Sequence, residues 1–126
     1  MRALGKARCW ACLLCLAQLF SLVAFAAEVP VKALISNPAQ FDGQTVTLQG
    51  TAIMVKATTS SRGNAYTTFQ VNDATGAAVR VFTWGHPGLK DGQPVEVVGV
   101  FQRVKRVGRY TFYNEVEARS VRPLSR

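Results

Sequence analysis

The chain contains two copies of one glycine-centred strand pattern, and this repeat constrains the fold more than any other feature. Residues 42–56, DGQTVTLQGTAIMVK, align without gaps on residues 91–105, DGQPVEVVGVFQRVK. The two copies share an opening Asp-Gly-Gln, one valine, a central glycine and a closing Val-Lys. A glycine inside a strand marks a bulge or sharp bend, so that the two halves of the strand can pair with different neighbours. Two such bent strands predict a small closed β-barrel.

Shorter strands fill the chain between and after the two bent ones. Residues 66–73, YTTFQVND, and residues 77–84, AAVRVFTW, lie on either side of a tight turn. In both segments, inward-facing apolar side chains alternate with outward-facing ones. A hairpin with its tip at Val107-Gly108 leads into a last strand that ends near Val121. These segments predict an all-β protein, a five-stranded Greek-key barrel.

One short helix is expected before the barrel. Val31, Leu34 and Ile35 recur at helical spacing, and Pro38 prevents a longer helix. We expect this N-terminal helix to plug one end of the barrel.

Residues 1–27 have the layout of a secretory signal peptide. A basic start is followed by an uncharged run from Cys9 to Ala27, which contains the small-x-small pattern Ala24-Phe25-Ala26. We predict a cleaved signal over residues 1–27, a domain over residues 28–126, and a periplasmic or secreted location. The alternative is an uncleaved anchor, because the uncharged run approaches the length of a membrane span.

Removal of the signal changes the cysteine content and the charge. Cys9, Cys12 and Cys15 all lie in it, so the remaining domain has no cysteine and no disulfide. The signal carries three of the 15 basic residues and none of the seven acidic ones, which leaves a net charge of +5. This charge favours polyanions such as nucleic acid, anionic lipid headgroups or lipopolysaccharide.

Three spaced motifs carry a family resemblance. They are GQTVTLQG at residues 43–50, FQVNDATGAAVRV at residues 69–81 and DGQPVEVVG at residues 91–99. In this order, and across residues 31–121, the chain resembles the OB-fold, in particular the nucleic-acid-binding type found in anticodon-binding and single-strand-binding proteins. The resemblance implies a binding face on the second and third barrel strands, flanked by the loops between strands one and two and between strands four and five.

On this chain the implied binding face combines aromatic and basic side chains. Exposed aromatic rings stack with bases, for about 1–3 kcal/mol per base, while arginines follow the phosphates. The expected ligand-binding residues are Arg62, Tyr66, Thr68, Gln70, Arg80, Phe82, Trp84, Arg103, Lys105, Arg106, Arg109, Tyr110 and Phe112. The alternative is structural: Phe82 or Trp84 caps the barrel core, and the basic hairpin is a solvated edge that discourages aggregation.

The sequence offers little for catalysis, a metal or a cofactor. His86 lies in a Gly/Pro loop without a second metal-binding residue nearby, and Lys90 stands where an exported haem-carrying OB-fold chaperone would need the Tyr of its His-x-x-x-Tyr motif. Glu115 and Glu117 share a strand face with Arg119, which predicts a solvent-exposed charged stripe. We therefore expect a non-enzyme with no cofactor.

The leading interpretation is an exported, non-enzymatic OB-fold protein that binds an anionic ligand, such as single-stranded nucleic acid or another polyanion. The alternative is a periplasmic protein-interaction or envelope-stress module that holds an envelope protein on the same face. The protein would contact the membrane only through an uncleaved signal segment.

Overall fold

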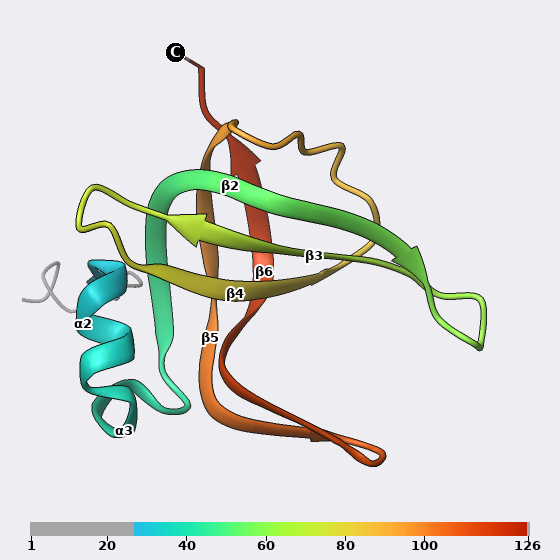
Figure 1. Ribbon diagram of the computed structural model, residues 1–126, viewed down its shortest axis with the longest axis horizontal. Coiled ribbons are helices and arrows are strands. Elements are labelled where there is room, and N and C mark those ends of the chain that lie inside the picture. The colour runs from blue at the N-terminus through green and yellow to red at the C-terminus, as the bar shows by residue number, and fades with distance from the viewer. Residues whose placement is uncertain (1–26, 126) are drawn as a thin grey trace, which may run out of the picture.

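In the computed structural model, which describes residues 27–125, five long strands form a closed barrel (Figure 1). In spatial order the strands are β2, β3, β4, β6 and β5, and β5 pairs back onto β2 to close the sheet. The predicted five-stranded all-β barrel is therefore confirmed. The strands are β2 (Thr45–Thr59), β3 (Ala65–Asn72), β4 (Ala78–Trp84), β5 (Pro94–Val107) and β6 (Tyr110–Pro123).

The sequence did not predict a sixth, very short strand at the start of the described region. β1 (Ala27–Glu28) pairs in parallel with Val46 and Thr47 of β2. The rest of the predicted signal peptide, residues 1–26, lies outside the described residues. Across residues 27–125, none of the helices has the length and apolar character needed to cross a membrane.

The two repeated segments lie against each other in the barrel. Residues 45–51 of β2 pair antiparallel with residues 94–100 of β5. Leu48 lies opposite Val97, its own counterpart in the other repeat. The repeat is therefore arranged about a local two-fold axis that passes between these two residues.

Each Asp-Gly-Gln turn is hydrogen-bonded to the other repeat, and the positions that the two aspartates bond differ by one residue in the alignment. Asp42 Oδ1 accepts a bond from Arg103 N (2.9 Å), and Asp91 Oδ1 accepts one from Val55 N (2.8 Å). The backbone bonds are equivalent in the two copies, so the shared residues hold the two copies together. They are Gly43 N to Phe101 O (2.8 Å), Phe101 N to Gln44 O (2.9 Å), Gly92 N to Ala52 O (2.7 Å) and Ala52 N to Gln93 O (2.8 Å).

The repeat's central glycines lie where neighbouring strands cross most closely. A Cβ atom at Gly50 would lie 2.6 Å from the carbonyl oxygen of Asn72, and one at Gly99 would overlap the carbonyl oxygen of Glu117. Pairing of β2 passes from β5 to β3 at Thr51, directly after the first glycine. The predicted bend at these positions is confirmed, and close backbone approach is its physical cause.

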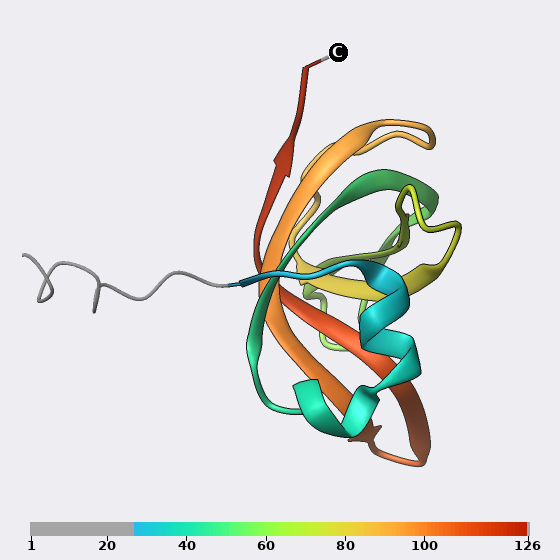
Figure 2. The same ribbon diagram turned by 90° about the vertical axis from the view of Figure 1, so that its left-hand side faces the viewer.

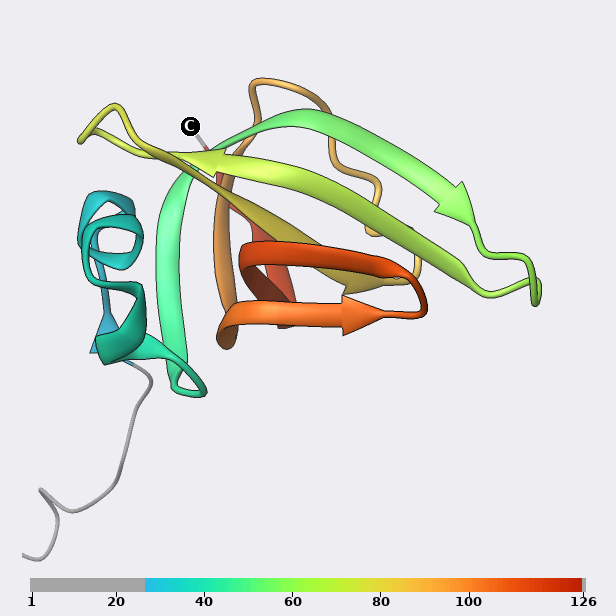
Figure 3. The same ribbon diagram turned by 60° about the horizontal axis from the view of Figure 1, so that its bottom comes forward.

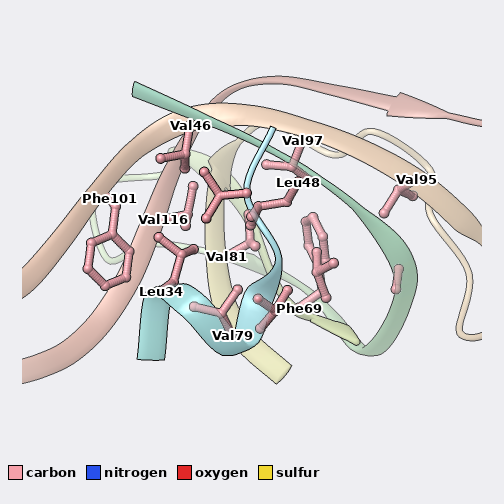
Figure 4. Packing of buried hydrophobic residues seen from close by; sticks show 14 of the residues in the cluster. Leu34, Val46, Leu48, Phe69, Val79, Val81, Val95, Val97, Phe101 and Val116 are labelled. Atoms are coloured by element: carbon pink, nitrogen blue, oxygen red, sulfur yellow. The ribbon is translucent and has the colours of Figure 1, made fainter. Parts of the chain in front are cut away.

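A short helix closes one end of the barrel, as predicted (Figure 2). Val31 and Leu34 of α2 (Val31–Ser36) are fully buried, and Figure 4 shows Leu34 among core side chains such as Val79. Ile35, which was expected on the same face, is 38 % exposed.

Pro38 ends α2 but begins a second short helix, α3 (Pro38–Phe41), so the expectation of a single helix was wrong. Proline suits the first turn of a helix, because its missing N–H has no partner there.

Asp73, in the turn between β3 and β4, fixes the start of α2. Val31 N donates to Asp73 Oδ2 at 2.7 Å, and Thr75 N donates to Asp73 Oδ1 at 3.0 Å. Burial would raise the pKa of Asp73, but hydrogen bonds from Thr75 and Val31 together outweigh it and place the pKa below its ordinary value. The turn thereby ties the helix to the barrel.

Candidate nucleic-acid interface

Two hairpins extend beyond the barrel on the side away from α2 (Figure 3). A groove lies between them. One hairpin joins β2 to β3, and the other joins β5 to β6 through Gly108 and Arg109. We call the space between them the aromatic groove; its volume is 560 Å³. It is lined by Ser60, Tyr66, Arg80, Phe82, Trp84, Lys105, Val107, Tyr110, Phe112, Glu115 and Glu117.

Three aromatic rings from the outer face of β3 and β4 form one wall of the groove. Tyr66 and Phe82 stack with ring centroids 5.4 Å apart, and Trp84 meets Phe82 edge to face at 5.0 Å. The cross-strand pairing of Tyr66 with Trp84 places these rings side by side. Trp84 remains 61 % exposed. Phe82 and Trp84 therefore do not cap the barrel core, which was the structural alternative.

Two cation–π contacts join the β5–β6 hairpin to this wall in a reciprocal way. Lys105 of the hairpin places its Nζ 4.1 Å from the ring centroid of Phe82 on β4. Arg80 of β4 places its Cζ 4.7 Å from the ring centroid of Phe112 on the hairpin. Each partner thus contributes one cation and one ring, and the two contacts hold the hairpin against β4.

A single buried carboxylate holds both of these cations. Glu115 is 1 % exposed; its Oε2 lies 2.7 Å from Arg80 Nε and its Oε1 lies 2.9 Å from Lys105 Nζ. Lys105 Nζ also lies 3.4 Å from Glu117 Oε1. The prediction of a solvent-exposed stripe was therefore wrong for Glu115, which lies in the floor of the groove.

An irregular step between β5 and β6 changes which hairpin residues share the face of Glu115. Asn114 has φ = 55°, in the left-handed region, and the regular cross-strand pairs skip from Val104–Tyr113 to Gln102–Glu115. The strict alternation of faces is broken there, since Phe112 and Glu115 both line the groove although they are three residues apart. Asparagine tolerates this backbone conformation, and it is the one sequence signal that marks the step.

The structure brings together about half of the predicted binding residues. In the aromatic groove are Tyr66, Arg80, Phe82, Trp84, Lys105, Tyr110 and Phe112. Thr68 and Gln70 line a neighbouring hollow of 170 Å³ that shares Arg80 with the groove. The remaining predicted residues, Arg62, Arg103, Arg106 and Arg109, line neither.

The predicted arginines outside the groove have different positions. Arg106 pairs across the hairpin with Thr111, one step from the Lys105–Phe112 pair, so it lies on the opposite face from the groove. Arg109 sits at the hairpin tip with its Cζ 5.7 Å from the ring centroid of Tyr110. Arg62 is exposed in the loop that also carries Ser60, a groove residue.

Four groove residues were not predicted from the sequence, namely Ser60, Val107, Glu115 and Glu117. Val107 follows Lys105 at the spacing of one strand face and is 50 % exposed. Strand periodicity from Lys105 was the signal that would have identified it.

No metal centre is apparent in the described part of the chain, where no three His, Cys, Asp or Glu side chains are grouped to hold an ion. His86 is exposed, and its Nε2 lies 3.1 Å from the carbonyl oxygen of Thr58.

The sequence matches no protein-family model, and no curated protein matches it at a significant level. Several solved structures are similar to this chain in fold. The N-terminal domain of PriB protein from Thermoanaerobacter tencongensis is 18 % identical, with a TM-score of 0.50 over 65 % of this chain and 97 % of that one. An aspartyl-tRNA synthetase from Leishmania major Friedlin is 11 % identical, with a TM-score of 0.57 over 81 % of this chain.

This chain covers only 22 % of the synthetase. The second OB-fold domain of replication protein A from Methanococcus maripaludis is 17 % identical, with a TM-score of 0.47 over 68 % of this chain and 88 % of that one. At these identities the similarity concerns the fold alone. The protein is an OB-fold domain, as the resemblance in the sequence implied.

Proposed function

We propose that this OB-fold domain binds single-stranded nucleic acid in the aromatic groove. The gathering of five aromatic side chains in one open groove is the observation that carries the proposal. Trp84 and Tyr110 are 61 % and 59 % exposed, and they belong to opposite walls. Flat rings that remain open to solvent are platforms on which successive bases stack, for about 1–3 kcal/mol per base.

The charge of the domain supports the same ligand. Residues 28–126 carry +5, which attracts a polyanion over a distance. Arg62 and Arg109 lie near the ends of the two hairpins that border the groove. Phosphates would therefore follow the rims while the bases enter between them.

The protein would act as an exported, non-enzymatic binder in the periplasm or outside the cell. The predicted signal peptide over residues 1–27 supports this location.

Anisotropy of a fluorescein-labelled single-stranded 12-mer, measured against the purified protein, tests the proposal. Tyr110→Ala should weaken binding about tenfold, because it removes one stacking platform. Tyr113→Ala is the matched control: Tyr113 is a 68 % exposed tyrosine of the same hairpin outside the groove, and its loss should change affinity less than about twofold. Wild-type affinity should fall steeply with added salt. Absence of binding at low salt would refute the proposal.

One observation favours a second candidate function, a protein partner from the cell envelope. Val104 and Tyr113 pair across the outer face of the β5–β6 hairpin, and they are 39 % and 68 % exposed. An apolar patch of this kind suits a protein surface. Binding of an envelope protein that persists in high salt and is lost in Tyr113→Ala would support this candidate.

A further inference from the structure

The charges inside the aromatic groove balance one another, and this determines which part of a nucleotide can enter. Its two cations, Arg80 and Lys105, are both held by Glu115, and Lys105 also contacts Glu117. Within residues 27–125, no other cation lines the groove. A phosphate placed there would meet carboxylates whose cations are already paired, so the interior suits bases rather than phosphates.

Glu117 is the carboxylate that a base in the groove would meet. Its side chain is 44 % exposed, whereas that of Glu115 is 1 % exposed. In the parallel pairing of β4 with β6, Glu117 lies beside Phe82, at the aromatic wall. Its ionic contact with Lys105 Nζ is long, at 3.4 Å, and involves Oε1. A stacked base would therefore present its edge to a carboxylate that still reaches solvent.

An ionised carboxylate only accepts hydrogen bonds, so it distinguishes bases by their N–H donors. Guanine offers an imino and an amino N–H side by side, which can bond both carboxylate oxygens. Cytosine and adenine each offer one amino group. The N3–H of thymine or uracil stands between two carbonyl oxygens, which a carboxylate repels.

We propose that Glu117 is a specificity-determining residue that favours bases with amino groups, guanine foremost, over thymine and uracil. This inference rests on the proposed function, since it requires a single strand in the groove. The two can nevertheless fail separately, because affinity for any strand and preference among strands are different measurements.

The test compares four labelled single-stranded 12-mers by anisotropy: thymidine, adenosine, cytidine and 7-deazaguanosine homopolymers in the deoxy series. The 7-deaza base keeps the guanine edge that Glu117 would contact and removes the N7 needed for four-stranded association. The purified wild-type protein should bind the deazaguanine 12-mer most tightly and the thymidine 12-mer at least about fivefold more weakly than the cytidine one.

Glu117→Gln should abolish this preference, because an amide both donates and accepts hydrogen bonds. Lys105 keeps its 2.9 Å bond to Glu115 in this variant, so the groove retains its shape. Glu96→Gln is the matched control: Glu96 bonds Gln49 and Arg122 outside the groove, and the preference should persist.

Equal affinity for all four strands in the wild type, or a preference that survives in Glu117→Gln, would overturn the inference and leave the proposed function standing. Failure of every strand to bind would overturn both.

Discussion

The two repeats are nearly equivalent up to their central glycine and different beyond it. Before the glycine, both copies form the paired strands and turns that close the barrel. Beyond Gly50 the first copy runs into the β2–β3 hairpin, which gives the groove Ser60 and Tyr66. Beyond Gly99 the second copy runs into the β5–β6 hairpin, from which six groove residues between Lys105 and Glu117 come. The shared turns and glycines build the barrel, whereas most of the groove residues come from the segments beyond the repeats.

The closing lysine of the repeat shows the difference at a single position. Lys105 lies across from Phe112 and contacts Glu115, Glu117 and the Phe82 ring. Lys56, its counterpart, lies across from Thr68 and is exposed at a small hollow. The opposing strand, rather than the lysine itself, decides whether the position belongs to the groove.

Substitution of the shared glycine should have the largest effect on stability. Gly99→Ala would place a methyl group against the backbone of Glu117 and Ala118, which cannot move aside like a side chain, and should lower the unfolding free energy by about 3 kcal/mol. Urea denaturation measures this loss. Gly63→Ala is the control, because a Cβ atom at this position would meet nothing within 4 Å. Its φ of +85° disfavours alanine, so this substitution should lower the unfolding free energy by about 1 kcal/mol. Equal losses at the two positions would contradict close approach as the reason for the glycine.

Removal of the Glu115 carboxylate, which joins the second repeat's hairpin to β4, should have the next largest effect. Glu115→Ala leaves Arg80 and Lys105 without their buried partner, and the unfolding free energy should fall by about 2 kcal/mol, since both cations keep some access to water. The exposed pair Glu96–Arg122 is the reference, because Glu96→Ala should change stability little. A Glu115→Ala protein as stable as the wild type would show that the ion pairs do not hold the hairpin.

Substitutions of the two closing lysines, Lys105 and Lys56, should differ in their effect on stability by a smaller amount. Lys105→Met should lower the unfolding free energy by about 1 kcal/mol, because it removes the ion pairs and the contact with Phe82. Lys56→Met, the equivalent change in the first repeat, should leave stability unchanged within about 0.5 kcal/mol. Similar values for both variants, measured by thermal unfolding, would mean that the repeats have not diverged in this respect.

Substitution of Asp73, which lies outside both repeats and accepts hydrogen bonds from α2 and Thr75, should have the smallest effect on stability. This effect should depend on pH. The pKa of Asp73 is lower in the folded protein than its ordinary value of 3.8, so its contribution is present above that value and is lost as the pH falls through the folded pKa. Asp73→Asn should therefore destabilise the protein by about 1 kcal/mol near pH 6 and by less near pH 2.5. Urea midpoints at the two pH values provide the measurement. If the stability difference between wild type and Asp73→Asn were the same at both pH values, an ionised Asp73 would not be the anchor of α2.

Much of the fold could be predicted because local signals and global structure agree. The repeated Asp-Gly-Gln turns, the alternation in residues 66–84 and the central glycines all pointed to one barrel. The second helix and β1 could not be predicted in the same way, because each is very short and depends on contacts with the barrel.

The site was predictable where strand alternation holds and not where it fails. Tyr66, Phe82 and Trp84 lie on the expected outer face of β3 and β4. The left-handed backbone at Asn114 interrupts the alternation, so that Phe112 and Glu115 line the same groove. Glu115 was expected in a surface stripe, but it is buried and paired with Arg80 and Lys105. A residue's partner across an irregular hairpin depends on three-dimensional geometry that periodicity does not contain.

Amide chemical-shift mapping during titration with the unlabelled single-stranded cytidine 12-mer tests most directly whether the second repeat's hairpin builds the binding site. The largest shifts should occur in residues 105–117 and at Tyr66, Phe82 and Trp84, with smaller ones in residues 52–57 of the first repeat. Shifts that spread equally over both repeats, or that concentrate near Gln49, Glu96 and Arg122 outside the groove, would contradict the account.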